Sequence, residues 1–257
     1  MSQIYYVDPN PTSDKPILFL HGLGVDGTSW LPQIQVFSEA GYRPIAVDLP
    51  GFGNSPYDGR GWSLKRTVKE LAGLLDELKT GPVYLVGLSL GGVMAQQFAL
   101  DNPELVQQLV LVSTFAVLRP ENFSQWLYFL QRVIFVHVLG LKAQATIVAR
   151  RVFPEPDKEV LREMVVEKIA NADPRAYRAA MRSLGLFNSL RKLPALHIRT
   201  LVISGESDTT VSPLRQQVLV DNIKNARHVV IPEAGHAVNI DQPELFNRTV
   251  LDFLSNT

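Results

Sequence analysis

Short apolar runs alternate with helix-length segments near both ends of this chain. The pattern covers the first 115 residues and returns after residue 199. Parallel strands need long crossover connections, and strands buried on both faces are continuously apolar. We therefore predict an α/β fold, a mostly parallel central sheet flanked by helices. The expected strands are Ile17–Leu20, Ile45–Val47, Val83–Val86, Leu109–Val112, Thr200–Ser204 and His228–Ile231, with a weaker one at Ile4–Val7.

The middle of the chain lacks this alternation. Residues 116–196 have amphipathic helical patterns interrupted by proline and glycine, which predicts a helical cap inserted into a core domain of residues 1–115 and 197–257. The cap carries 13 Lys and Arg against 7 Asp and Glu, a net charge of +6. A solvated charged face is the favoured interpretation of this excess, and a docking surface for an acidic carrier protein is the alternative.

The composition excludes several classes of protein. The chain has no cysteine, so disulfides, thiolate metal sites and a cysteine nucleophile are excluded. Its formal net charge is zero, which gives no indication of a nucleic-acid partner. The segment Met1–Pro9 lacks the basic start and apolar run of a signal peptide, and no segment of the chain reaches about 18 uncharged apolar residues, the length that a membrane span needs. We expect a cytoplasmic protein without stable membrane insertion.

One pentapeptide places a serine at a sharp turn. Gly87-Leu88-Ser89-Leu90-Gly91 follows a predicted buried strand and begins a predicted helix. Such a turn exposes the serine hydroxyl, and its tight backbone requires glycine two residues before and after. The amides at the start of the following helix favour negative charge near the serine. Ser89 is therefore the candidate nucleophile.

A serine hydroxyl needs a base to remove its proton, and the base needs a carboxylate to orient it. Of five histidines, His236 lies in a glycine-containing loop after the last predicted strand, where functional residues gather. Asp208 lies in the loop after the preceding strand, with Glu206 as the nearest rival. We predict that His236 is the general base and Asp208 the carboxylate that orients it.

An acyl-transfer site also needs donors for the oxyanion. One is expected from the backbone N–H of Leu90, directly after the nucleophile. The other is expected from the loop His21-Gly22-Leu23-Gly24, which follows the early strand. The position of Leu23 in this loop favours its backbone N–H as the second donor. His21 itself is interpreted as a structural residue of the loop.

The same early loop matches a competing motif. Gly22, Gly24 and Gly27 have the spacing of the dinucleotide-binding fingerprint. Asp48 lies 21 residues after Gly27, close to the position of the acidic residue that binds a ribose hydroxyl in that motif. The rival function is a nicotinamide-dependent oxidoreductase. In that motif, however, the helix begins within the glycines, whereas here the helix-start signals Thr28 and Ser29 follow them. The rival would also leave the serine, histidine and aspartate unexplained.

Taken together, these motifs resemble those of the α/β-hydrolase superfamily over nearly the whole chain. The matching pieces are the His21 loop, the segment Asp48–Ser55, the Ser89 turn, Gly205–Asp208 and Gly235-His236. The resemblance implies a sheet of about eight strands. It is greatest to small carboxylesterases, enol-lactone hydrolases and pimeloyl-carrier-protein methyl ester esterases, which carry helical caps.

Single residues separate some branches of the superfamily. Haloalkane dehalogenases and epoxide hydrolases use an aspartate nucleophile, where this chain has Ser89. Carbon–carbon bond hydrolases usually carry tryptophan after the histidine, where this chain has Ala237. Lactone hydrolases and cofactor-free haloperoxidases share the same catalytic groups and stay as alternatives, as does a non-catalytic ligand-binding homologue.

The hypothesis from sequence is a carboxylesterase that forms an acyl-enzyme intermediate on a small-molecule ester and needs neither cofactor nor metal. Small to medium apolar acyl groups are the expected substrates. Aromatic residues at helical spacing more often pack in a core than line a pocket. Those of the cap are Phe123, Trp126, Phe129, Phe135, Phe153 and Tyr177.

Overall fold

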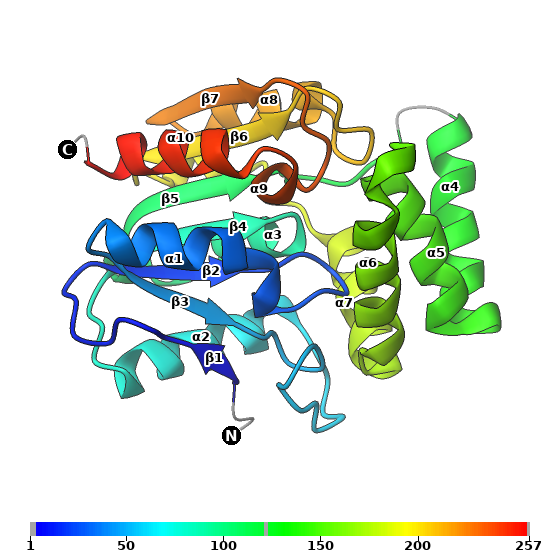
Figure 1. The fold of residues 1–257 in the computed structure, drawn as a ribbon, viewed down its shortest axis with the longest axis horizontal. Helices are drawn as coiled ribbons and strands as arrows, with labels where there is room; N and C mark the ends of the chain where they lie inside the picture. The colour runs from blue at the N-terminus through cyan, green and yellow to red at the C-terminus, as the bar shows by residue number, and fades with distance from the viewer. Residues whose placement is uncertain (1–3, 121–122, 256–257) are drawn as a thin grey trace.

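A seven-stranded sheet organises the molecule, seen in a computed structural model that describes residues 4–120 and 123–255 (Figure 1). Its strand order is β1-β3-β2-β4-β5-β6-β7; β1 pairs antiparallel with β3, and all other pairs are parallel. The predicted α/β fold is therefore confirmed. The strands are β1 (Tyr6–Val7), β2 (Pro16–Leu20), β3 (Arg43–Val47), β4 (Val83–Leu88), β5 (Val106–Val112), β6 (Thr200–Gly205) and β7 (Ala226–Ile231).

The expectation of about eight strands is wrong for the described residues, which form seven. The segment between β1 and β2 contains Pro9 and Pro11, which have no backbone N–H to donate to a neighbouring strand. Asp8 instead binds Arg43 of β3 through an ion pair of 2.7 Å. The chain thus passes from the edge strand into the middle of the sheet without adding a strand.

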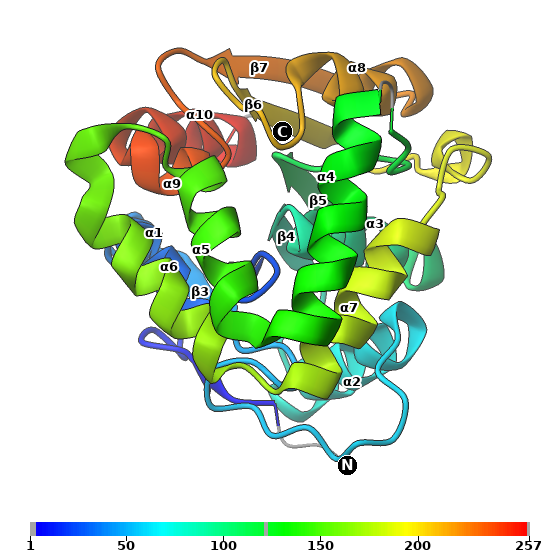
Figure 2. The same cartoon turned by 90° about the vertical axis from the view of Figure 1, so that its right-hand side faces the viewer.

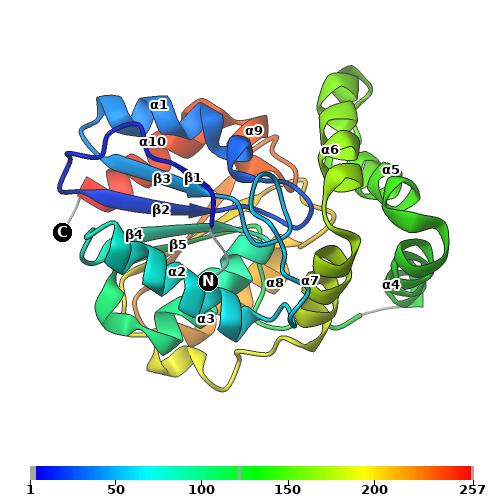
Figure 3. The same cartoon turned by 90° about the horizontal axis from the view of Figure 1, so that it is seen from below.

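Alternate residues of the central strands fill two apolar layers. On β2, Ile17 and Phe19 face the layer under α1, α9 and α10, whereas Leu18 and Leu20 face the layer under α2, α3 and α8. Figure 3 shows helices on both faces of the sheet. These helices are α1 (Leu31–Glu39), α2 (Leu64–Glu77), α3 (Leu90–Asp101), α8 (Pro213–Asn222), α9 (Val238–Asp241) and α10 (Pro243–Ser255).

Four further helices lie between β5 and β6 in the chain. Together we call them the helical insert (residues 123–186). They are α4 (Phe123–Ile134), α5 (Gly140–Val152), α6 (Glu159–Asn171) and α7 (Pro174–Leu186), with a π-helical turn at Phe135–Leu139. They lie beyond the carboxyl ends of the parallel strands (Figures 1 and 2). The domain boundaries predicted at residues 115 and 196 stay predictions.

The insert packs directly on the loops of the sheet. The Asp173 N–H donates to the Gly51 carbonyl at 2.9 Å. Gly51 has φ of +87°, and a Cβ there would lie 2.2 Å from the Cβ of Ala176. Glycine at this position therefore lets α7 approach the loop after β3.

The first half of the helical insert is long and apolar. The helical stretch Phe123–Val152 is, by length and composition, apolar enough to cross a membrane, and 28% of its most apolar window is buried. The stretch is not straight, because Gly140 has φ of +83°. Its two α-helices, of 12 and 13 residues, are each shorter than the roughly 20 residues that a membrane span needs.

Candidate active site

Ser89 occupies a strained turn between β4 and α3. Its φ of +54° and ψ of −108° are unusual for a residue with a side chain. The crowding that sequence analysis expected is present: a Cβ on Gly87 would lie 2.3 Å from the Gly91 carbonyl oxygen, and one on Gly91 would lie 2.0 Å from that of Leu20. The Ser89 N–H donates to Val112 on β5 at 2.9 Å. The turn is thus held by strands on both sides of β4.

Asp208 and His236 lie on neighbouring loops, after β6 and β7. The His236 Nδ1 is 2.9 Å from the Asp208 Oδ2. Because a carboxylate only accepts, Nδ1 carries the hydrogen and Nε2 is left without one in the neutral ring. The other carboxylate oxygen accepts from the N–H groups of Thr210 at 2.8 Å and Val211 at 2.9 Å.

Glu206, the rival of Asp208, lies elsewhere. Its side chain is exposed and accepts a hydrogen bond from the Glu233 N–H at 3.3 Å. The two loops approach each other closely at glycine, since a Cβ on Gly205 would lie 2.1 Å from the Gly235 carbonyl oxygen. This close approach brings Asp208, and not Glu206, to the histidine.

His21 shapes the loop after β2. Its Nε2 accepts the Leu49 N–H at 2.9 Å, so its Nδ1–H donates to the Gly22 carbonyl at 2.7 Å. Burial lowers the pKa of His21, which favours this neutral form. The ring thus fixes the backbone next to Leu23, in agreement with the structural role that sequence analysis gave it.

Asp48 is fully engaged by its own surroundings. One carboxylate oxygen accepts the Gly27 N–H and the other accepts the Asn54 N–H, both at 2.7 Å. The side chain is buried and bridges two loops. These contacts disfavour the dinucleotide interpretation, in which this carboxylate must bind a ribose hydroxyl.

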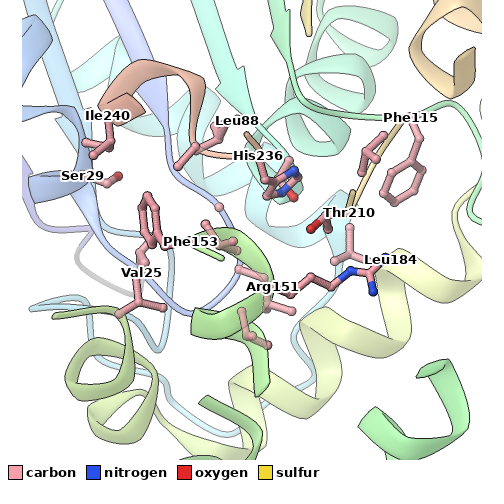
Figure 4. A pocket seen from close by; sticks show the side chains of 18 of the residues that line it. Val25, Ser29, Leu88, Phe115, Arg151, Phe153, Leu184, Thr210, His236 and Ile240 are labelled. Atoms are coloured by element: carbon pink, nitrogen blue, oxygen red, sulfur yellow. The ribbon is translucent and has the colours of Figure 1, made fainter. Parts of the chain in front are cut away.

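A cavity of about 160 Å³ lies between the sheet and the helical insert, and both Ser89 and His236 line it. Leu23 also lines this cavity, and Leu90 is the first residue of α3 behind it. Figure 4 shows the imidazole of His236 among apolar side chains that include Leu88, Phe115 and Phe153. Among the described residues, the Ser89 hydroxyl and the His236 ring make no direct hydrogen bond.

Five of the six cap aromatics divide three ways. Phe129 and Phe153 line the cavity, whereas Tyr177 is fully buried in the core and Phe123 and Trp126 are exposed. Sequence analysis missed three polar lining residues of the helical insert, which are Tyr128, Arg132 and Arg151. Helical periodicity could not find them, because it does not show which face of an inserted helix turns toward a distant serine.

The remaining histidines lie away from the cavity. The His137 Nδ1 is 2.9 Å from the Val133 carbonyl oxygen, and His228 bonds with Ser204 and Gln217. Across residues 4–120 and 123–255, no three His, Asp or Glu side chains are grouped as ligands for a metal ion.

Comparison with known proteins gives relatives with several names. The chain is 29% identical to a Variovorax paradoxus protein named as a carbamate hydrolase, covering 98% of this chain and 96% of the relative. It is 32% identical to a 2-hydroxy-6-oxononadienedioate/2-hydroxy-6-oxononatrienedioate hydrolase of Burkholderia vietnamiensis, covering 98% and 91%. It is 28% identical to a pimeloyl-[acyl-carrier protein] methyl ester esterase of Aeromonas hydrophila, covering 93% and 94%.

The fold has close matches among solved structures. The enol-lactonase of Burkholderia xenovorans superposes with a TM-score of 0.89 at 24% sequence identity, covering 99% of this chain and 97% of the enol-lactonase chain.

The family model described as "Alpha/beta hydrolase family" matches residues 17–249 of this chain. That range includes the Ser89 turn, the Asp208 and His236 loops and the whole helical insert. On this match and on the seven-stranded sheet, the chain belongs to the α/β hydrolase family.

Proposed function

We propose that this protein is a serine carboxylesterase, with Ser89 as nucleophile, His236 as general base and Asp208 as the carboxylate that orients it. The observation that carries the proposal is the 2.9 Å contact between the Asp208 Oδ2 and the His236 Nδ1. It leaves Nε2 as the proton acceptor of a ring that lines the same cavity as Ser89.

The reaction has two halves. As the Ser89 Oγ attacks the ester carbonyl carbon, the His236 Nε2 takes the hydroxyl proton and then gives it to the departing alcohol. Water next attacks the acyl-enzyme while the same nitrogen accepts its proton; as the bond from the acyl carbon to the Ser89 Oγ breaks, that nitrogen returns the proton to Oγ and the acid leaves. Ester and water become acid and alcohol, and the proposed steps use no cofactor or metal.

Two backbone amides are suited to the oxyanion. Leu90 is the first residue of α3, and the N–H groups of a first helical turn have no acceptor within the helix. Leu23 lines the cavity on the loop that His21 fixes. We propose that these two N–H groups donate to the oxyanion, where the positive end of the α3 dipole adds to its stabilisation.

The cavity indicates a small substrate. An engineered protein cavity of about 150 Å³ holds one benzene molecule, and the cavity beside Ser89 has about 160 Å³. Its apolar walls suit a small to medium acyl group. The relatives named for an ester, a carbamate or a lactone have substrates with a carbonyl group open to a nucleophile, so a lactone is the second candidate substrate for the same steps.

Replacing the serine tests the proposal. We expect Ser89→Ala to lower the kcat/KM for 4-nitrophenyl butyrate by about 1,000-fold or more, because the nucleophile is lost. A fluorophosphonate should add once to the wild-type protein and not to Ser89→Ala, as read by intact mass. Hydrolysis that survives in Ser89→Ala, or an adduct on that variant, would contradict the role of Ser89.

A matched pair of acid variants tests the carboxylate. We expect Asp208→Asn to lower kcat by about 1,000-fold or more, because it disturbs the tautomer of His236. Glu206→Gln should keep wild-type kcat, since Glu206 is exposed and contacts the Glu233 backbone instead. The reverse result would assign the role to Glu206.

A further inference from the structure

Two arginines of the helical insert line the cavity beside Ser89. They are Arg132 on α4 and Arg151 on α5, and both are half-buried. The other lining residues of this cavity include no aspartate or glutamate. Neither arginine forms an ion pair within the described part of the chain. The lining of this cavity therefore has an excess of positive charge.

Arg151 has an unused donor. Its Nη2 donates to the Thr209 carbonyl, which holds the side chain against the loop of Asp208. Its Nε is buried and has no hydrogen-bond partner. Figure 4 shows Arg151 in the cavity wall, near Thr210 and Leu184. A buried N–H without a partner costs free energy until a ligand supplies an acceptor.

Arg132 is held only by neutral groups. Its Nη2 donates to the Tyr177 hydroxyl at 3.3 Å. With the Gln144 amide turned so that its oxygen faces the guanidinium, that oxygen accepts from Nε at 2.7 Å and from Nη2 at 3.1 Å. These contacts fix the direction of the guanidinium and leave its charge uncompensated.

Tyr128 brings the two charges together. The guanidinium carbon of Arg151 lies 4.3 Å from the centre of the Tyr128 ring, and that of Arg132 lies 5.8 Å from it. An aromatic face attracts a cation, but it carries no net charge and cannot cancel the repulsion between two guanidinium groups. The carboxylate of Asp208 is already bound to His236, Thr210 and Val211.

We propose that Arg132 and Arg151 bind a free carboxylate of the substrate, so that the preferred substrates are half-esters of dicarboxylic acids or carboxylated lactones. This inference rests on the proposed esterase function. A carboxylate matches the guanidinium fork with two oxygens, and the remaining walls are largely apolar, which suits the connecting carbon chain. The carboxylate takes no part in the bond changes; it binds and orients the ester.

Matched esters that differ only in charge test the inference. We would compare the monoethyl esters of succinate, glutarate and adipate with the ethyl esters of the corresponding monoamides, which are neutral and of nearly equal size. At the best chain length, the kcat/KM of the anionic ester should exceed that of the amide by about tenfold or more, as for a charge-assisted hydrogen bond.

Variants of the arginines identify the groups responsible. Arg151→Met and Arg132→Met should each lower the anionic-to-neutral ratio of kcat/KM about tenfold, and Arg151→Lys should restore part of it because the charge returns. Arg150→Met is the matched control: it removes the same charge one residue away, from an exposed side chain outside this cavity, and should keep the ratio. An equal effect of Arg150→Met would assign the preference to the overall charge of the insert and overturn the proposal.

Binding measured without turnover separates this inference from the proposed function. Calorimetry on Ser89→Ala should show tighter binding of the anionic ester than of the amide, and Arg151→Met in that background should remove the difference. Serine-dependent hydrolysis with a ratio near one would overturn the carboxylate site and leave the esterase intact. Hydrolysis that persists in Ser89→Ala would overturn the esterase, while the binding comparison would still report on the arginines.

Discussion

At the scale of single residues, the glycines around Ser89 are fixed by their neighbours. A Cβ on Gly91 would lie 2.0 Å from the Leu20 carbonyl oxygen, so the backbone itself must move to accept a side chain. We expect Gly91→Ala to lower the free energy of unfolding by about 1–3 kcal/mol, measured by urea denaturation. Gly73→Ala on α2 is the control, because a Cβ there meets nothing within 4 Å and alanine favours the helix by about 0.5–1 kcal/mol. Equal stability of the two variants would show that the turn relaxes freely.

At the scale of elements, lysines of the insert hold α6 and its preceding turn against the loops of the site. Lys168 binds Asp26 at 2.6 Å, and Lys158 binds Asp241 at 2.6 Å. Burial raises the pKa of Asp26, but hydrogen bonds from Lys168 and Thr28 outweigh it and lower the pKa below its ordinary value. The stabilisation by this ion pair is therefore present above about pH 4 and is lost as pH falls through the pKa of Asp26 in the folded protein.

We expect Lys168→Met to lower the free energy of unfolding by about 1 kcal/mol at pH 7 and by progressively less below pH 4, measured by urea denaturation. Lys69→Met is the control: it changes an exposed position of α2 and should show no such pH dependence.

At the scale of the whole molecule, the insert and the sheet share one apolar core. Ile169 and Tyr177 of the insert belong to the same buried cluster as Leu18 and Leu85 of the sheet. We therefore expect a single unfolding transition, with equal urea midpoints by tryptophan fluorescence and by far-ultraviolet circular dichroism. The experiment uses Trp126→Phe, so that the emission comes only from Trp30 and Trp62, both outside the insert. Two separate midpoints would show that the insert unfolds on its own.

Much of the core fold could be predicted from local patterns. Each predicted strand lies within or overlaps one of β1 to β7, because short apolar runs are typical of strands in a parallel sheet. The Ser89 turn could be predicted because its glycines are required by contacts within the turn and with the adjacent strand. The preference for Asp208 over Glu206 stays a prediction of function, but the structure brings Asp208 to His236, 28 residues away.

The alternation of strands and helices, the turn at Ser89 and the loops that carry Asp208 and His236 could be found in the amino-acid sequence alone, because each depends on residues close together in the chain. The contacts of Arg132 and Arg151 with Tyr128 beside Ser89, and of Lys168 with Asp26 across 142 positions, depend instead on the packing of distant segments. Helical periodicity identifies an apolar face but not the partner against which it packs. The direction in which an inserted helix presents its charges is set by packing between distant segments, which no local pattern encodes.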